Sequence, residues 1–410
     1  MLESILDLSL FPSLMAKKTA AKAPPHIVVV GAGIIGASIA WHLAAQHGAT
    51  VTIVATDIGG IATPNSFAWI NANFGNPHFY HDFRRRSMAH WHELAEGHEA
   101  IPGLQNLIRW TTTIQWSGPA DKLAADCEKY ASWGYDVRGA KNAELAAHEP
   151  WLADAQLPET GWGLCIGGEG SVEAADAARL IIAHAQTAHG AKLLSAEVTR
   201  LLVDVSTGAV QGIVTASGDT IAADHVVLAA GLGTVPLAAT AGVTVPVHGR
   251  PGLLVHSKPV TQRLLDGIVI SNGPHMRQTV DGRILSGTDF AGTDTGTDPQ
   301  ARADALFSRV KTTFRPALGD TTLPDLELDY YTIGYRPDPE DGLPILGASG
   351  RAGLTLAVMH SGVTLAAIVG QSIADLIVDG KEDPDLASFA LSRFDSAGSE
   401  ECAGMELRRT

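Results

Sequence analysis

The stretch HIVVVGAGIIGASIAWHLAAQHGATVTIVATD, residues 26–57, decides the fold of this chain. It opens with HIVVV, a continuous apolar run of the kind found in strands that are covered on both faces. GAGIIG follows at once, and residues 34–48 are rich in small and helix-forming residues. VTIVAT then returns as a second apolar strand. Strand, helix and strand in this order predict a parallel βαβ unit.

The glycines of GAGIIG have the spacing of a dinucleotide-binding turn. Gly31 permits a tight turn, Gly33 lets the backbone approach a phosphate, and Gly36 lets the helix pack closely on the strand. The N–H groups at the start of the helix, at Ile34 and Ile35, are expected to face the same anion, which the helix dipole attracts. The turn therefore predicts a pyrophosphate-binding site, because the strand before it and the helix and strand after it are all present.

The end of the second strand departs from this pattern. An acidic side chain that holds a ribose hydroxyl is expected about 20 residues after the turn, and Ala55 occupies that place. Asp57 is the candidate replacement, with Thr56 as a weaker donor; the alternative is that Asp57 is only a solvated turn residue. No arginine is present there for a 2′-phosphate, so the departure does not favour NADP.

Composition and charge are typical of a soluble globular protein without a polyanionic partner. The 410 residues exceed what one core usually supports, which predicts two domains. The formal net charge of −15 argues against nucleic acids and anionic membranes, since both need basic patches. The one dense basic run, Arg84–Arg86, is predicted to be a solvated helix face. No segment has the roughly 18 uninterrupted apolar residues of a membrane span.

Cysteine and histidine usage indicates neither a disulfide framework nor a metal site. Cys127, Cys165 and Cys402 are odd in number and widely spaced, which favours a reducing compartment and a cytoplasmic location. Histidines are concentrated between residues 78 and 98, yet no carboxylate completes a ligand set with them, so no metal is expected. These histidines are His78, His81, His90, His92 and His98.

Elements of the same α/β class recur far apart in the chain. A helix begins near residue 174, and the hairpin-like 211–224 leads into the strand HVVL. The predicted fold class is α/β, with a discontinuous Rossmann-like FAD-binding domain and a substrate domain built on an antiparallel sheet. The first domain is assigned residues 25–96, 171–244 and 331–390, the second 97–170 and 245–330, and the two tails 1–24 and 391–410.

Several segments, taken in their order and spacing, resemble a known enzyme family. They are GAGIIG, TPNSFAWINANFG at 63–75, the strand that holds Val198, VVLAAG at 226–231, GYRPDPEDGLPILG at 334–347 and HSGVTLA at 360–366. Together they are similar to the FAD-dependent amine and amino-acid oxidase family that includes D-amino acid oxidase, glycine oxidase and sarcosine oxidase. The resemblance covers residues 26 to about 385.

The resemblance implies an FAD whose isoalloxazine lies between the two domains and accepts a hydride at flavin N5 from the carbon next to an amine. It also implies that dioxygen reoxidises the flavin to give H2O2, and that the imine hydrolyses in water. Sarcosine oxidase relatives hold their flavin through a cysteine near the position of Ile333 and Gly334 here. No cysteine lies between Cys165 and Cys402, so a noncovalent flavin is expected.

The resemblance also assigns segments to the cofactor. Thr63, Asn65 and Ser66 offer hydrogen bonds to its phosphate or ring. Residues 362–364 open the last helix, whose positive end is expected to face an anionic reduced flavin. The expected cofactor residues are Gly31, Gly33, Ile34, Ile35, Gly36, Asp57, Thr63, Asn65, Ser66, Val198, Ala230, Gly231, Gly362, Val363 and Thr364.

Four residues are candidates for the reaction itself. Arg336 resembles the arginine that clamps the substrate carboxylate in glycine oxidase and D-amino acid oxidase, and a guanidinium fork pairs bidentately with such a group. The alternative for Arg336 is a surface or interdomain salt bridge. Trp69 and Asn71 are candidate walls of the substrate site, or parts of a structural loop. His360 is a candidate for flavin tuning or proton transfer, or else a packing residue.

A fifth catalytic candidate, His275, occupies a strand position where relatives often carry a tyrosine that faces the substrate. Arg277 lies two residues on and so shares its sheet face, where a second cationic group suits a dicarboxylic or bulky acidic substrate. The alternative for both is a polar residue on a solvated strand face. His248 is a further, weaker candidate.

These features predict an FAD-dependent oxidase of an amino acid or N-substituted glycine that uses O2, with a homo-oligomer as one option for its assembly. One alternative is a flavin-dependent dehydrogenase that passes electrons to a quinone or a partner subunit. Another is a flavoprotein that binds an amino acid or a partner without turnover. An NAD-dependent dehydrogenase is disfavoured, because residues 334–366 have no role in such a fold.

Overall fold

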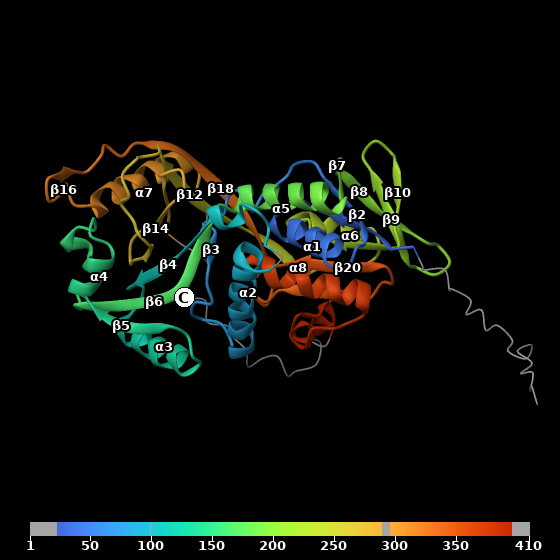
Figure 1. Ribbon diagram of the computed structural model, residues 1–410, viewed down its shortest axis with the longest axis horizontal. Coiled ribbons are helices and arrows are strands. Elements are labelled where there is room, and N and C mark those ends of the chain that lie inside the picture. The colour runs from blue at the N-terminus through green and yellow to red at the C-terminus, as the bar shows by residue number, and fades with distance from the viewer. Residues whose placement is uncertain (1–22, 99, 289–295, 396–410) are drawn as a thin grey trace, which may run out of the picture.

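The computed structural model describes residues 23–395, except residue 99 and residues 289–295. Most of the predicted N-terminal tail, residues 1–22, lies outside this part of the chain, as does Cys402. Figure 1 shows an elongated molecule in which the elements of two large sheets form two halves along the long axis.

The predicted βαβ unit forms the centre of a six-stranded sheet. β1 (His26–Val30) pairs in parallel with β2 (Thr50–Ala55) on one side and with β11 (His225–Leu228) on the other. The strand order is β19-β20-β11-β1-β2-β7, and β19 alone in this sheet runs antiparallel to its neighbour. The outer strands are β7 (Lys192–Ser195), β19 (Ile345–Ala348) and β20 (Leu354–Val358).

Helices from distant parts of the chain pack around this sheet (Figure 1). α1 (Ile34–Ala45) contacts α5 (Ala174–His189) and α8 (Gly362–Asp379), and α2 (His78–Glu96) contacts α8. α1 is buried along most of its length, and its small side chains let both neighbours approach. The C-terminal helix is thereby placed against the glycine-rich turn.

α8 is the one helix of the described residues that is long and apolar enough to cross a membrane. More than half of it is buried inside the protein, where Leu365, Ala366 and Val369 belong to the core around α1. Its apolar composition is explained by this packing, because a helix covered on several sides needs few polar residues.

The other half is a nine-stranded sheet in the order β18-β12-β15-β14-β13-β4-β6-β3, to which β5 is added beside β6. Its pairs are antiparallel, except that β13 and β4 are parallel. The strands are β3 (Trp69–Ile70), β4 (Ile108–Gln115), β5 (Val137–Lys141), β6 (Trp162–Val172), β12 (Val247–Ser257), β13 (Ile268–Ile270), β14 (His275–Gln278), β15 (Ile284–Gly287) and β18 (Leu328–Pro339).

The two sheets confirm the predicted α/β class, with a Rossmann-like parallel sheet and a largely antiparallel one. The domain boundaries stay a prediction. β3 and most of β18 lie in the ranges assigned to the Rossmann-like domain, yet both strands belong to the nine-stranded sheet. These two strands stand at the two ends of the strand order of the larger sheet.

Shorter elements complete the fold. A three-stranded sheet and a two-stranded ribbon are formed by β8 (Val198–Val203), β9 (Val210–Thr215), β10 (Thr220–Ala222), β16 (Ala317–Leu318) and β17 (Thr321–Thr322). The remaining helices are α3 (Ala120–Ser132), α4 (Asn142–His148), α6 (Thr234–Ala239), α7 (Pro299–Thr313), η1 (Leu104–Leu107), η2 (Asp154–Gln156), η3 (Gly231–Gly233), η4 (Pro384–Phe389) and η5 (Leu391–Phe394).

The position of Gly36 gives a test of this packing. A Cβ atom there would overlap the carbonyl oxygen of Gly31, which is backbone and has no room to move. We expect Gly36→Ala to lower the free energy of unfolding by about 3 kcal/mol or more, measured by chemical denaturation. Gly139→Ala is the control, because the nearest atom to its Cβ would be Trp162 at 4.0 Å. Equal losses of unfolding free energy in the two variants would show that the close approach at Gly36 is not the cause.

Candidate cofactor and substrate site

One long cavity collects most of the residues that the sequence singled out. Its volume is about 760 Å³, and it is lined by the ends of β1, β2 and β11 and by residues 56–71, 334–337 and 357–364, among others. The lining segments come from both large sheets. Every expected cofactor residue lines it except Gly36, whose place is in the packing of α1.

The glycine-rich turn lies in the wall of this cavity. Gly31 has a φ of +110°, and a Cβ on it would collide with the backbone of Ala229 at the end of β11. Gly33 is the N-cap of α1, which has no side-chain cap and no acidic residue in its first turn. Thr63 lies beside it, since its Oγ1 accepts a hydrogen bond from Ile34 N–H at 3.2 Å. The positive end of α1 therefore opens onto the cavity, as an anionic ligand requires.

Two acidic residues lie near Ala55, which occupies the place of the expected ribose-binding acid. Ala55 pairs with Ser195 of β7 in a parallel register, so both strands end at the same edge of the sheet. Asp57 follows one strand and Glu197 the other, and both line the cavity with Val198. Sequence reasoning missed Glu197. The available signal was its position just after a strand of the parallel sheet, but the neighbour of β2 was not evident from the sequence.

Another wall of the cavity contains Trp69, which is on β3, and Asn71, which comes directly after this strand. The Asn71 side chain is engaged inside the protein, because its Oδ1 accepts from Arg84 Nη2 at 2.7 Å. The hydroxyl of Thr364 donates to the Trp69 carbonyl at 2.9 Å, so this wall is tied to the start of α8. Asn65 and Ser66 also line the cavity, with side chains bonded to nearby backbone carbonyls.

Arg84 corrects the expectation that Arg84–Arg86 form a solvated helix face. Its side chain is buried, lines the cavity, and donates to the Asn71 carbonyl at 3.0 Å and to Ser361 Oγ at 2.9 Å. Helical periodicity explains this, because Arg84 shares the face of Tyr80 and Ser87, which are also buried. Ser361 itself has a φ of +58° and caps α8, so Arg84 fixes a strained turn at the cavity wall.

Arg336 lies on β18 and lines the same cavity. The neighbouring strand β12 makes room for it, since a Cβ on Gly252 would collide with the Arg336 guanidinium. Arg250, the residue opposite Arg336 in the β12–β18 register, forms an ion pair with Asp338. The guanidinium of Arg336 is therefore held close against β12 while it borders the cavity.

His360 lines the cavity between the arginines and the start of α8. Burial, together with the smaller effects of the charges of Arg336, Arg84 and Arg250 in that order, lowers its pKa to about 3. Its Nδ1 is 3.0 Å from Ser361 Oγ. The imidazole is therefore neutral above about pH 3 and exchanges hydrogen bonds rather than charge.

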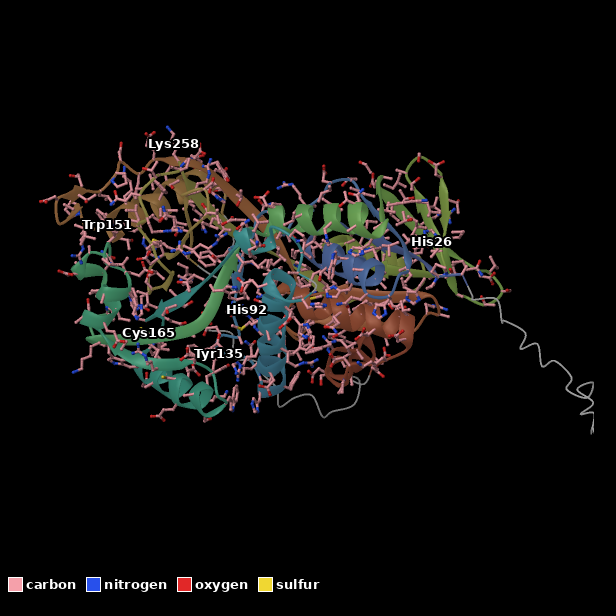
Figure 2. All side chains as sticks on the ribbon, viewed as in Figure 1. His26, His92, Tyr135, Trp151, Cys165 and Lys258 are labelled. Atoms are coloured by element: carbon pink, nitrogen blue, oxygen red, sulfur yellow. The ribbon has the colours of Figure 1, made fainter. Side chains whose placement is uncertain are left out.

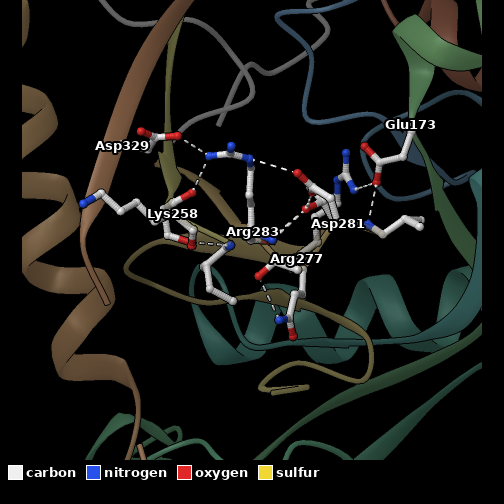
Figure 3. Close-up of polar contacts among 12 residues, drawn as sticks. Glu173, Lys258, Arg277, Asp281, Arg283 and Asp329 are labelled. Atoms are coloured by element: carbon white, nitrogen blue, oxygen red, sulfur yellow. Dashed lines mark hydrogen bonds and ion pairs between the residues drawn. The ribbon is translucent and has the colours of Figure 1, made fainter. Parts of the chain in front are cut away.

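Three other candidates lie elsewhere. His275 is buried on β14 and is not part of the cavity lining. Arg277 corrects the expectation of a substrate-facing cation, because it is buried and donates to the Phe67 carbonyl at 2.7 Å and to Glu173 at 3.0 Å. Figure 3 shows this pair beside the separate cluster around Arg283. His248 is exposed and pairs with Glu340.

In two groups of described residues, side chains of the kinds that bind metals lie close to one another. They are Glu144, His148 and Cys165, and His47, Asp375 and Asp379. In the first, Glu144 is already paired with Arg138. In the second, the two ring nitrogens of His47 face different carboxylates, at 3.0 Å and 3.6 Å. In the second group a histidine therefore lies between two acids. Neither group contains the clustered histidines between residues 78 and 98.

Comparison with known proteins decides the family. The model of the FAD dependent oxidoreductase family, DAO, matches residues 26–376. This chain belongs to that family. The glycine oxidase of Geobacillus kaustophilus is 27% identical over 382 residues, which are 90% of this chain and 96% of that protein. The crystal structure of a glycine oxidase from the same species superposes with a TM-score of 0.75, covering 90% of this chain and 99% of that one.

A second relative of this FAD-dependent oxidoreductase is one of the subunits of the opine oxidase of Rhizobium meliloti. It is 29% identical over 384 residues, which are 91% of this chain and 99% of that protein. The enzyme described here therefore uses FAD, and the cavity fits that cofactor. The glycine-rich turn, the acids Asp57 and Glu197 and the arginines Arg84 and Arg336 all line it, which is a donor set that suits a pyrophosphate, a ribose and an anionic ligand group.

The three hydrogen bonds of Arg84 provide a prediction. Arg84→Met leaves buried acceptors on Asn71 and Ser361 without their donor, so we expect the free energy of unfolding to fall by about 3 kcal/mol in chemical denaturation. Arg86→Met is the matched control on the same helix, because Arg86 is exposed and its ion pairs with Asp383 and Asp385 should contribute less than about 1 kcal/mol. A loss at Arg84 no larger than that at Arg86 would refute its structural role.

Proposed function

We propose that this FAD-dependent oxidoreductase oxidises the C–N bond of an amino acid or an N-substituted glycine whose carboxylate pairs with Arg336. The observation that carries the proposal is the placement of Arg336 in the same cavity as the glycine-rich turn. The acidic residues among the described cavity lining, Asp57 and Glu197, both follow strands of the parallel sheet, whereas Arg336 lies on β18 of the larger sheet. The electrostatics around Arg336 therefore favour an anionic substrate group.

We assign the lining residues to the parts of FAD from their positions along the cavity. The positive end of α1, with the N–H group of Ile35, holds the pyrophosphate, whereas Ile34 N–H already donates to Thr63 Oγ1. Asp57 and Glu197 face the adenosine, and the backbone at residues 362–364 faces the flavin ring. When bound, FAD supplies a hydride acceptor at flavin N5. A noncovalent cofactor is proposed because no cysteine lies between Cys165 and Cys402, where sarcosine oxidase relatives have the cysteine that holds their flavin.

The side chains of the substrate end orient the substrate and exclude water. Arg336 fixes the carboxylate and thereby the carbon next to the amine. Trp69 and Asn71 form a wall whose hydrogen bonds to Arg84 and α8 hold it rigid. A substrate amine that binds in its neutral form needs no side-chain base.

Dioxygen is the proposed electron acceptor, with H2O2 and a hydrolysing imine as products. The main rival is a dehydrogenase that passes its electrons to another acceptor or to a partner subunit. It is motivated by the similarity to a protein that is itself one subunit of an opine oxidase. Turnover in air compared with turnover on an artificial dye acceptor separates the two.

We further propose a reducing, cytoplasmic location and a small-molecule amine as the partner. Cys127 and Cys165 are free thiols in the described structure, as a reducing compartment favours. A homo-oligomer is one option for the assembly, and size-exclusion chromatography with light scattering measures the oligomeric state directly.

An anaerobic bleaching screen tests the function. Purified holoenzyme is mixed with glycine, sarcosine, D-amino acids, proline analogues and iminodiacids, and the flavin absorbance is followed. We expect at least one of these compounds to bleach the flavin and, in air, to release H2O2. A holoenzyme whose flavin no member of the panel reduces would overturn the proposal.

Replacing Arg336 tests the carboxylate clamp. We expect Arg336→Met to raise KM for the preferred amino acid roughly 100-fold, because a buried charge pair to the substrate is lost. The affinity for FAD and the oxidation of the corresponding amine without a carboxylate should change little. Arg250→Met is the control, since Arg250 lies opposite on β12 but pairs with Asp338. A KM that rises equally for both compounds would rule out a carboxylate clamp.

A further inference from the structure

Glu169 lies at the centre of a buried hydrogen-bond network behind the cavity wall. It is on β6 and is 0% exposed. Its Oε2 accepts from Trp69 Nε1 at 3.0 Å, and its Oε1 accepts from the Tyr135 hydroxyl. That hydroxyl in turn accepts from Ala72 N–H at 3.0 Å. The two carboxylate oxygens therefore hold both ends of the segment from Trp69 to Ala72.

This segment is the wall of the proposed substrate site. Trp69 and Asn71 line the cavity, whereas Glu169 and Tyr135 lie behind them and do not. Figure 2 labels Tyr135 in the half of the molecule built on the nine-stranded sheet. Any influence of Glu169 on a ligand must therefore pass through the indole of Trp69 or the backbone of Ala72.

The surroundings of Glu169 place its ionisation near neutral pH. Burial raises its pKa to about 7, while the hydrogen bonds from Tyr135 and Trp69 and the charge of Arg84 on α2 oppose this rise. Burial also raises the pKa of Tyr135 well above its usual value, so the phenol stays neutral. His81, also on α2, packs edge-on against Tyr135 at 5.0 Å, and burial lowers its pKa. Arg84 is thus the charged group that faces this carboxyl.

The ionised and the protonated forms of Glu169 accept hydrogen bonds of different strength. The carboxylate accepts from Tyr135 and Trp69 at the same time, and hydrogen bonds to a charged acceptor are the stronger kind. The protonated acid carries an O–H of its own, which occupies one oxygen and leaves weaker acceptors for the two donors. Trp69 is therefore held most firmly when Glu169 is ionised.

We propose that Glu169 is a positioning residue. Its hydrogen bond orients the ring of Trp69 beside the substrate, and substrate binding is stronger when Glu169 is ionised. This inference rests on the proposed function, since it takes Trp69 to border the substrate. Glu169 does not line the cavity, so it acts on the substrate through its hydrogen bond with Trp69.

The chain offers a matched control in Glu149. This residue is 1% exposed, burial raises its pKa to about 7 as well, and it accepts hydrogen bonds from the backbone N–H groups of Asp266 and Gly267. It does not line the cavity. Glu149→Gln therefore reports the general consequence of removing a buried acid with this pKa.

The first test measures the binding of 2-furoate to the holoenzyme, because this carboxylate has no amine to oxidise and stays ionised in the range used. Its Kd is read from the perturbation of flavin absorbance across about pH 5.5 to 8.5, on both sides of the Glu169 pKa of about 7. We expect the wild-type Kd to fall on the order of ten-fold as pH rises. Glu169→Gln should abolish this transition, and Glu149→Gln should keep it. A transition that survives in Glu169→Gln would overturn the inference.

The second test asks whether Glu169 acts through Trp69. Trp69→Phe keeps an aromatic wall but removes the N–H donor, so adding Glu169→Gln to it should change Kd no further. Fully additive effects of the two substitutions would contradict the proposal. FAD content and thermal midpoint, measured on each variant, separate a lost contact from a lost fold.

These outcomes distinguish the inference from the function on which it rests. If no amino acid bleaches the flavin but 2-furoate binding shows the Glu169-dependent transition, the proposed reaction is wrong and the positioning role stands. If amino acids bleach the flavin and Glu169→Gln retains the transition, the reaction stands and the positioning role is wrong.

Discussion

The close approach of three backbones at Gly31 is the constraint on which the rest of the structure depends. The turn after β1, the end of β11 at Ala229 and the first turn of α1 meet there without room for a Cβ atom on Gly31 or Gly36. This contact aims the positive end of α1 into the cavity, and it keeps β1 and β11 in register at the edge where parallel strands end. Because α8 packs on α1, the same contact places the start of α8 beside the first turn of α1, where its neighbour His360 also lines the cavity.

Much of the cofactor end was predictable from the sequence because its requirements are local. The glycine spacing, the apolar strand before it and the helix after it are each fixed by neighbouring residues, and they predict the parallel sheet that is observed. Arg336 and residues 360–364 were found through their resemblance to a family, and the structure places them together in the cavity. The family match over residues 26–376 agrees with that resemblance.

The residues that sequence reasoning missed depend on long-range packing. Arg84 looked like part of a solvated basic run, since nothing in the run RRR shows which face of the helix meets the Asn71 segment. Glu169 lies in the strand WGLCIGGEGSV and meets Trp69 only because β3 pairs with β6. Glu197 borders the cavity only because β7 is the neighbour of β2. In each case the strand or helix pairing, rather than the local sequence, decides where the side chain points.

The buried ionisable groups make the stability of the protein depend on pH. Glu169 and Glu149 have pKa values of about 7, above their ordinary 4.5, so their contribution to stability is full below about pH 4.5 and is lost as pH rises through 7. His360, with its pKa lowered from 6.5 to about 3, contributes in the opposite sense, and its stabilising effect is lost as pH falls through 3. Near neutral pH the cavity end therefore contains a neutral imidazole, fixed arginine charges and, behind the wall, one carboxyl close to its midpoint. Such an arrangement favours an anionic ligand group beside Arg336.

The crystal structure of the holoenzyme with 2-furoate tests the central claim most directly, because it locates both ends of FAD and the ligand at once. We expect the pyrophosphate at the start of α1 beside Ile35 N–H, the flavin ring beside residues 360–364, and the carboxylate on Arg336. A flavin ring at the Asp57 and Glu197 end, or a carboxylate bound away from Arg336, would contradict it.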